Sequence, residues 1–380
     1  MRRLLTLCLA VLPALALAQE DPEAVLSGLL DQRDIAPDRL APAFRAEVPP
    51  AALTWVLDDV VAQVGTVEDI ALDGSRFTVT GTQAVVRGSI ALDDEGRIAT
   101  LFFEPPEPVA ETIDDVTEGL TELGADVAWL VTRGDETLAA HRADDVLSVA
   151  SAYKLGVLAA LRAEIESGAR DWADVVRLQD RHRSLPSGAM QDWPEGAPVT
   201  LQTAATLMIA ESDNTATDLL IDTLGREAVA RALGQDRVLT TREVFALRAD
   251  PDAAAAWRAA DPDEAARIAA EAARDLPDPA ALGDQGPDWQ LPARTLCDLM
   301  EHVGDLDILS VNPGPVPPDD WAQIAYKGGE LGDTYNLTAL VWDGRAPVCA
   351  VLTVNGRTAP PAEIVGAFRA LLAAAREAGE

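Results

Sequence analysis

A serine and a lysine lie three residues apart in the run Ser151-Ala152-Tyr153-Lys154. If a helix begins near Ser151, this offset places both side chains on one face, where the lysine amine can reach the serine hydroxyl. A serine becomes a good nucleophile only when a neighbouring base accepts its proton, and a desolvated lysine beside another cation can be that base. The pair predicts nucleophilic catalysis, but on its own it also fits a helix start that carries a surface lysine.

Two later polar motifs could supply the partners that such a nucleophile needs. Ser212-Asp213-Asn214 lies between two apolar stretches of helical periodicity, so this loop positions side chains rather than filling a core. Lys327-Gly328-Gly329 ends a strand-like run near the end of the chain. The two motifs add a second hydroxyl and a second cation to the candidate site.

Together the three motifs resemble those of class A β-lactamases and the related penicillin-binding proteins, in order, in spacing and in their helix, loop and strand settings. The resemblance covers residues 110–380. It implies that Ser151 is the acylated nucleophile and that Lys154 accepts its proton. It also implies that Ser212 relays a proton to the leaving nitrogen, while Lys327 holds Ser212 and helps to keep Lys154 neutral.

The same resemblance implies a set of substrate-binding groups. The Asn214 side chain would bind the substrate, and Gly329 and Glu330 would form part of the substrate-binding strand. The backbone N–H groups of Ser151 and Glu330 would form the oxyanion hole. No metal ion and no cofactor are expected.

Two positions depart from the class A pattern. The third motif usually has a threonine or serine after its lysine, and that hydroxyl helps to bind the substrate carboxylate, whereas this chain has Gly328. Class A enzymes also carry a glutamate that activates the deacylating water, with an asparagine four residues later. Glu243 lies at a roughly suitable place, but Leu247 replaces the asparagine. Glu243 is therefore either the deacylation base or a structural charge paired with a neighbour such as Arg242 or Arg248.

Three functions are compatible with this pattern. The first is an exported serine hydrolase that opens β-lactams, or related amides and esters, through a Ser151 acyl-enzyme. The second is a penicillin-binding D,D-peptidase that acts on peptidoglycan stems with the same residues. The third is a non-catalytic cell-wall binding protein that keeps the pocket, which the intact serine and lysine set disfavours.

The elements that must position these residues follow from hydrophobic periodicity. Two strand-like runs, at 126–132 and 137–141, precede the Ser151 motif, and three more, at 323–327, 335–342 and 347–354, end the chain. They predict one five-stranded antiparallel sheet assembled from both ends of the domain and covered by helices, which is an α+β fold. The predicted helices begin near Ser151, after the cap Thr200, at Thr217 and at Pro361, and an insertion rich in alanine, aspartate and proline occupies about 249–286.

The segment before this domain has a different character. Residues 1–18 read as a secretory signal peptide, with two arginines, an apolar run and a small-residue cleavage pattern before Gln19, so we expect an exported protein in the periplasm or the medium. Residues 19–108 predict helices followed by an antiparallel meander, a small α+β cap domain that loosely resembles the cystatin or nuclear-transport-factor-like class. Residues 109–380 then form the catalytic domain.

Composition limits the partners. The chain has 30 Lys and Arg against 63 Asp and Glu, a net charge of −33 that repels nucleic acid and anionic membranes. No stretch is long and apolar enough to be a membrane span, so a small-molecule β-lactam or peptidoglycan-like substrate is the expected partner; nothing indicates the oligomeric state. The histidines lack metal-ligand spacing. Cys297 and Cys349 permit one disulfide, but we favour two free buried thiols because Cys349 lies in an apolar strand-like run.

Overall fold

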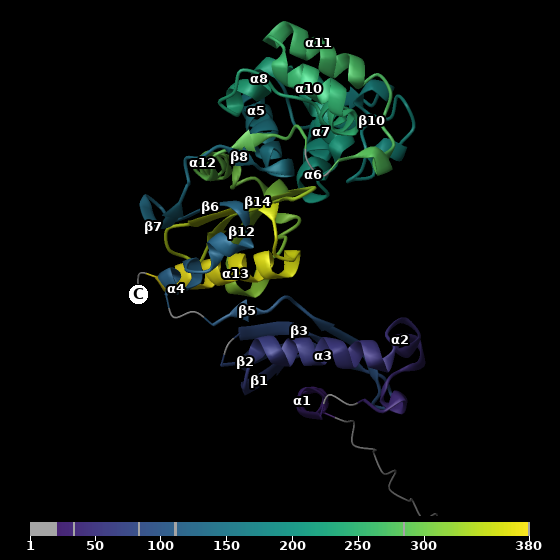
Figure 1. Cartoon of the computed structure of the whole chain (residues 1–380), viewed down its shortest axis with the longest axis vertical. Helices are drawn as coiled ribbons and strands as arrows, with labels where there is room; N and C mark the ends of the chain where they lie inside the picture. The colour runs from purple at the N-terminus through teal and green to yellow at the C-terminus, as the bar shows by residue number, and fades with distance from the viewer. Residues whose placement is uncertain (1–20, 33–34, 83, 110–111, 284–285, 379–380) are drawn as a thin grey trace, which may run out of the picture. The chain divides into compact units, whose positions relative to one another are not determined.

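The computed structural model describes residues 21–378 except for 33–34, 83, 110–111 and 284–285, so the predicted signal peptide and Cys8 lie outside the described residues. The chain divides into two compact units, one up to residue 109 and the other from residue 110 (Figure 1). In the described part of the chain, no helix combines the length and the apolar character needed to cross a membrane.

The N-terminal unit consists of helices laid on an antiparallel meander. Its helices are α1 (Pro22–Gln32), the 3-10 turn η1 (Pro37–Arg39), α2 (Pro42–Glu47) and α3 (Pro50–Val64). Its strands are β1 (Val67–Asp73), β2 (Arg76–Gly81), β3 (Ala84–Leu92) and β4 (Ile98–Phe103), which pair in sequence order, and β5 (Glu107–Pro108), which pairs with β3. This is the predicted helix-then-meander arrangement, while the likeness to cystatins stays a prediction.

Helix α3 shows why this unit holds together. Leu53, Leu57, Val60 and Val64 recur at helical spacing and are at most 5% exposed, so they form one buried face against β2 and β3. Removing such a face from water stabilises a fold by about 25 cal/mol per Å² of apolar surface. Pro50 at the first position and Gly65 just past the end, with φ of 75°, fix the limits of the helix.

The second unit is organised around a five-stranded antiparallel sheet in the order β12-β13-β14-β6-β7. These strands are β6 (Gly124–Arg133), β7 (Glu136–His141), β12 (Gln323–Leu331), β13 (Thr334–Trp342) and β14 (Val348–Arg357). The prediction of one sheet assembled from both ends of the domain is confirmed. Strand β12 carries Lys327 and forms an edge of this sheet.

Helices cover both faces of the sheet (Figure 1). On one face α13 (Pro361–Glu377) packs against β6, β13 and β14, next to the short helix α4 (Ile113–Thr117). On the other face α12 (Ala293–Val303) contacts the same three strands and α5 (Lys154–Glu166). Beyond α5 lie α6 (Leu201–Ala210), α7 (Asn214–Leu224), α8 (Arg226–Ala232), α9 (Thr241–Ala249) and the short two-stranded pairs β8–β11 (Leu147–Ser148, Gln290–Leu291) and β9–β10 (Val175–Arg177, Pro198–Thr200).

The predicted insertion folds into two helices, α10 (Pro251–Ala259) and α11 (Pro262–Ala272), that pack on α9. Their contact is small: Leu247, Ala254 and Ala269 are its buried members. Most other side chains of α10 and α11 are exposed, as expected for an inserted segment.

The prediction of two free thiols is wrong. Cys297 on α12 and Cys349 on β14 form a disulfide, with their Cα atoms 6.0 Å apart. Both side chains are buried, as the apolar setting of Cys349 predicted, but the sequence spacing carried no sign that α12 lies across β14. The bond ties the main covering helix to a central strand.

Candidate active site

Ser151 lies in a tight turn rather than in the first turn of a regular helix. The 3-10 turn η3 (Ala150–Tyr153) holds the serine, and α5 begins at Lys154, so the two residues span the junction. Ala150 has a φ of 46°, a left-handed conformation that is costly for a residue with a Cβ atom. Tyr153 stacks on Trp289, with ring centroids 3.9 Å apart, and thereby fixes the far side of the turn.

Lys154 is fully buried, which excludes the alternative of a surface lysine at a helix start. Its Nζ donates to the backbone oxygen of Ser212 at 2.5 Å and to Oδ1 of Asn214 at 2.7 Å, and it lies 3.2 Å from Oγ of Ser212. Burial, and then the positive charge of Lys327, lower the pKa of Lys154 well below its usual value. A lysine in this condition can be neutral and accept a proton.

The loop between α6 and α7 brings Ser212 to Lys154. Ser212 has a φ of 54°, so it adopts a strained backbone conformation of the kind that clusters at functional sites. Asp213 holds the loop: its carboxylate accepts from N–H of Ala216 at the start of α7, and from N–H of Ala189 and Met190. This buried cap explains why the chain can turn here between two apolar helices.

Lys327 reaches the same serine from the edge strand. Its Nζ donates to Oγ of Ser212 at 3.1 Å and to the backbone oxygen of Gly328 at 2.6 Å. The side chain is 4% exposed, and burial lowers the pKa of Lys327 to about 7. Lys154, Ser212 and Lys327 thus form one continuous polar network that comes from a helix, a loop and a strand.

Strand β12 also passes very close to the turn that holds Ser151. A Cβ atom placed on Gly329 would lie 2.5 Å from the backbone nitrogen of Ser151 and 2.5 Å from the backbone oxygen of Val149. Only glycine permits this approach, because both contacts are to backbone atoms that cannot rotate away. The glycine therefore brings the backbone of the edge strand next to the backbone N–H of the serine.

A cavity of about 560 Å³ opens over this network. Ser151, Ser212, Lys327, Gly329 and Glu330 all line it, together with Ser187, Ile209, Ala210, Glu211, Asn312, Tyr326, Gly328, Tyr335, Asn336 and Leu337. Asn214 lies beneath this surface, where Lys154 donates to its Oδ1 and its Nδ2 donates to the backbone oxygen of Leu185.

A family model described as "Beta-lactamase enzyme family" matches residues 108–375, which include all three motifs of the site. The chain belongs to the beta-lactamase enzyme family. This membership supports hydrolase chemistry of the serine β-lactamase kind in the second unit. A search of curated proteins found no match.

Solved structures of this family share the fold of the second unit. A β-lactamase from Sphaerobacter thermophilus has a TM-score of 0.52 at 18% identity, over 69% of this chain and 94% of that one. PBP-A has a TM-score of 0.51 at 18% identity, over 71% of this chain and 99% of that one. A mutant of the class A β-lactamase of the last common ancestor of Gram-negative bacteria has a TM-score of 0.52 at 17% identity, over 70% of this chain and 99% of that one. At these identities the likeness establishes the β-lactamase fold alone.

Glu243, the candidate deacylation base of this β-lactamase family member, does not line the cavity over Ser151. It is 4% exposed and forms a two-pronged ion pair with Arg226, at 2.7 and 2.9 Å. Its carboxylate also accepts from N–H of Thr240, in the capping box that starts α9. The expected partners Arg242 and Arg248 instead donate to backbone oxygens. These contacts engage both oxygens of the Glu243 carboxylate.

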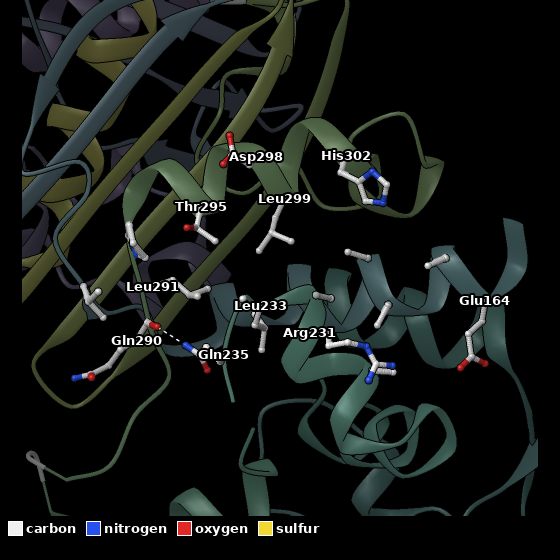
Figure 2. Close-up of a pocket in the computed structure, with 18 residues that line it drawn as sticks. Glu164, Arg231, Leu233, Gln235, Gln290, Leu291, Thr295, Asp298, Leu299 and His302 are labelled. Carbon is white, nitrogen blue, oxygen red and sulfur yellow. Dashed lines mark hydrogen bonds between the residues drawn. The ribbon is translucent and has the colours of Figure 1, made fainter. Parts of the chain in front are cut away.

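Figure 2 shows a separate pocket, between α5, α8 and α12. Labelled residues such as Leu233, Leu299 and His302 line it, and Gln235 donates to the backbone oxygen of Gln290 at its edge. None of the three motifs contributes a side chain to it. Among the described residues there is also no cluster of three His, Cys, Asp or Glu side chains that could hold a metal ion.

Sequence reasoning missed Asp213 and Tyr326 as parts of the site. Asp213 stands inside a motif that was already singled out, and its type is typical of a helix N-cap, so this signal was available. Tyr326 precedes Lys327 on a strand, where neighbouring side chains point to opposite faces, so nothing in the spacing indicates that its hydroxyl reaches the cavity.

Proposed function

We propose that this protein is an exported serine hydrolase that forms an acyl-enzyme on Ser151 with β-lactams or with related amides and esters. The observation that carries the proposal is the network in which Lys154 and Lys327 approach the single hydroxyl of Ser212 from two sides, at 3.2 and 3.1 Å. This arrangement supplies a neutral amine, a relay hydroxyl and a cation beside one nucleophile.

The proposed acylation transfers the proton of Ser151 to Lys154 and a proton of Ser212 to the leaving group. Oγ of Ser151 attacks the carbonyl carbon while its proton passes to Nζ of Lys154, and the developing oxyanion lies against the backbone N–H groups of Ser151 and Glu330. The carbon–nitrogen bond then breaks as Ser212 gives a proton to the leaving nitrogen, and the lysines restore the proton of Ser212. Each oxyanion donor contributes roughly 3 kcal/mol to such a step. Water then hydrolyses the ester and releases Ser151.

The second candidate is a D,D-peptidase that penicillin acylates and whose acyl-enzyme is hydrolysed slowly. The observation that favours it is the position of Glu243, whose carboxylate is held by Arg226 and Thr240 and which does not line the cavity. The fold of a similar protein accommodates such an adduct, because an L158E mutant of PBP-A has been solved as an acyl-enzyme complex with penicillin G.

The Cys297–Cys349 disulfide supports the export part of the proposal, because disulfides form and persist in oxidising compartments. Expression of the whole chain in a Gram-negative host, followed by fractionation and N-terminal sequencing, tests this part. We expect a periplasmic protein that begins at Gln19. A cytoplasmic protein that begins at Met1 would contradict it.

Intact-mass spectrometry tests the catalytic part. The mature protein and its Ser151→Ala variant are incubated with penicillin G or a chromogenic cephalosporin, and the adduct is followed over time. Rapid turnover with a transient adduct supports the hydrolase, and a stable adduct supports the D,D-peptidase. Equal reaction of the Ser151→Ala variant would refute the assignment of the nucleophile, and no adduct with any β-lactam or activated ester would leave the non-catalytic binding protein.

A further inference from the structure

The space beside Gly328 is already occupied by another side chain. A Cβ atom placed on Gly328 would lie 2.2 Å from the Oη atom of Tyr326 and 3.0 Å from its Cζ atom. Tyr326 and Gly328 are two residues apart on β12, so they share a face of the strand. The phenol therefore fills the volume that a serine or threonine side chain at position 328 would need.

The tyrosine ring is held in this place by a second glycine. Gly314 has a φ of 58°, and a Cβ atom on it would lie 2.1 Å from Cε1 of Tyr326. The loop that carries Gly314 is fastened by Asn312, whose Oδ1 accepts from N–H of Gly314 and whose Nδ2 donates to the backbone oxygen of Ala210, two residues before Ser212. The ring thus fits between two glycines in a slot that is anchored to the catalytic loop.

Tyr326 is one of the residues that line the active-site cavity. Tyr326 lines that cavity with Ser151, Ser212 and Lys327, and its Oη makes no hydrogen bond to any residue in the described part of the chain. Burial raises the pKa of Tyr326, so the group keeps its proton at working pH and can donate a hydrogen bond. An unused donor on a residue that lines a reaction cavity is suited to bind substrate.

A cation lies beside this donor. Nζ of Lys327 is bonded to the backbone oxygen of Gly328, so an ammonium and a phenol flank the same residue. Glu330, an acidic residue of the cavity rim, is paired with Arg357 at 3.1 Å, which offsets its charge. A cation and a neutral donor side by side match a carboxylate.

We propose that the Tyr326 hydroxyl binds the carboxylate on the leaving-group side of the substrate, and so replaces the hydroxyl that Gly328 lacks. This inference rests on the proposed function, because it names a determinant of the same site. In this chain the carboxylate-binding hydroxyl would come from Tyr326 instead of from a serine or threonine at position 328, two residues later on the same strand. The carboxylate could belong to a β-lactam or to the end of a D-alanyl peptide.

The test compares acylation rates with paired substrates. Second-order rate constants are measured by mass spectrometry for penicillin G and its methyl ester, and for an acyl-D-alanyl-D-lactate depsipeptide with a free or methylated carboxylate. In the Tyr326→Phe variant we expect a loss of roughly 10- to 100-fold for the free carboxylates and less than about threefold for the methyl esters. A selective loss with only one pair identifies the source of the carboxylate. The methyl esters, which lack the carboxylate, are the matched control within each pair.

A second pair of variants tests the geometry. Gly328→Ser alone should slow acylation by every substrate, because its Cβ atom meets Oη of Tyr326. The double variant Tyr326→Leu and Gly328→Ser removes that contact and returns a hydroxyl to position 328, so it should recover at least tenfold over Tyr326→Leu for free carboxylates. Circular dichroism and thermal unfolding show that each variant is folded.

Several results would overturn the inference. One is an equal loss of acylation rate for the free acid and its methyl ester in Tyr326→Phe, and another is no loss of rate for either. A third is that the wild-type protein reacts at equal rates with both members of each pair. Acylation of Ser151 by p-nitrophenyl acetate, which has no carboxylate, separates these failures from failure of the proposed function. If that reaction persists while the carboxylate effect is missing, only the role of Tyr326 is refuted.

Discussion

The hydroxyl of Ser212 lies between two amines that have different tasks. Burial lowers the pKa of both lysines, but the Lys154 pKa is also lowered by the charge of Lys327. Acylation needs Lys154 without its extra proton and Lys327 with it. The geometry therefore lets one lysine act as the base and the other as the cation. Lys154 is the base, because the neighbouring charge of Lys327 lowers its pKa in addition to burial.

This separation predicts a bell-shaped dependence of acylation on pH. The rate should rise as pH increases through the lowered pKa of Lys154, because only the neutral amine accepts the proton of Ser151. It should fall above a pH of about 7, where Lys327 loses its charge. Acylation by penicillin G between pH 5 and 9 measures both limbs, because its leaving nitrogen needs the proton of Ser212.

The matched variant for this prediction is Lys327→Arg. A guanidinium stays charged throughout this range, so the descending limb should move well above pH 7 in Lys327→Arg. In Lys327→Ala the ascending limb should shift to higher pH, because the cation that lowers the pKa of Lys154 is gone. If the Lys327→Arg profile kept a descending limb near pH 7, the titrating group would not be Lys327.

At the residue scale, the types and order of the side chains indicate candidates for the site but not how they are held. The roles of Ser151, Lys154, Ser212 and Lys327 stay predictions, while hydrogen bonds join both lysines to Ser212, and Ser151 lines the same cavity as Ser212 and Lys327. The positive φ of Ser212 was not predictable, because a serine carries no sign of a left-handed conformation. The partner of Glu243 was not predictable either, since Arg226 comes from another helix and only the fold brings the two together.

At the scale of elements, the site depends on how closely β12 approaches the turn η3. Gly329→Ala should push these two backbones apart, because the added Cβ atom meets Ser151 and Val149 at 2.5 Å. We expect acylation to slow by roughly 100-fold, the effect of displacing an oxyanion donor, with the secondary structure retained. Gly119→Ala, where nothing lies within 4 Å of the added atom, should leave the rate unchanged. Equal rates in both variants would contradict the close-approach argument.

The loop that carries Ser212 depends on Asp213. Asp213→Ala removes an N-cap and leaves two further N–H groups, those of Ala189 and the buried Met190, without their acceptor. The free energy of unfolding should fall by about 3 kcal/mol, measured by urea denaturation.

Asp250 provides a control for this loss. It caps α10 through exposed N–H groups of Asp252 and Ala253, so Asp250→Ala should cost only about 1 kcal/mol. Similar losses in the two variants would show that Asp213 acts as an ordinary cap and does not fasten the loop.

Most elements were predictable because periodicity is a local property. The five strands of the second unit were all located from the sequence. Helix α7 begins at Asn214, three residues before the predicted start, because Asp213 caps it earlier than its apolar periodicity suggests. The first strand, Val67–Asp73, has no buried residue and so lacked the alternation that identifies a strand.

At the scale of the whole second unit, the Cys297–Cys349 bond closes a loop of 52 residues. Chain entropy alone predicts a stabilisation of about 4 kcal/mol for a loop of this length. Dithiothreitol should therefore lower the melting temperature of the wild-type protein, measured by calorimetry. The double variant Cys297→Ala and Cys349→Ala should already melt at the lower temperature and should not respond to the reductant. A reductant effect in this variant would assign the change to something other than the disulfide.

The central sheet also has a consequence for the order in which the protein is made. Strand β14 pairs with β6, so Leu352 lies opposite Trp129, and the proposed nucleophile Ser151 belongs to the part of the chain that is synthesised first. A nascent chain that ends before β12 holds Ser151, Lys154 and Ser212, but lacks Lys327 and three of the five strands. Such a topology has a high contact order, and contacts between distant segments form late and slowly. Under the proposed mechanism, Ser151 therefore becomes reactive only after the C-terminal strands have been made and have paired with β6.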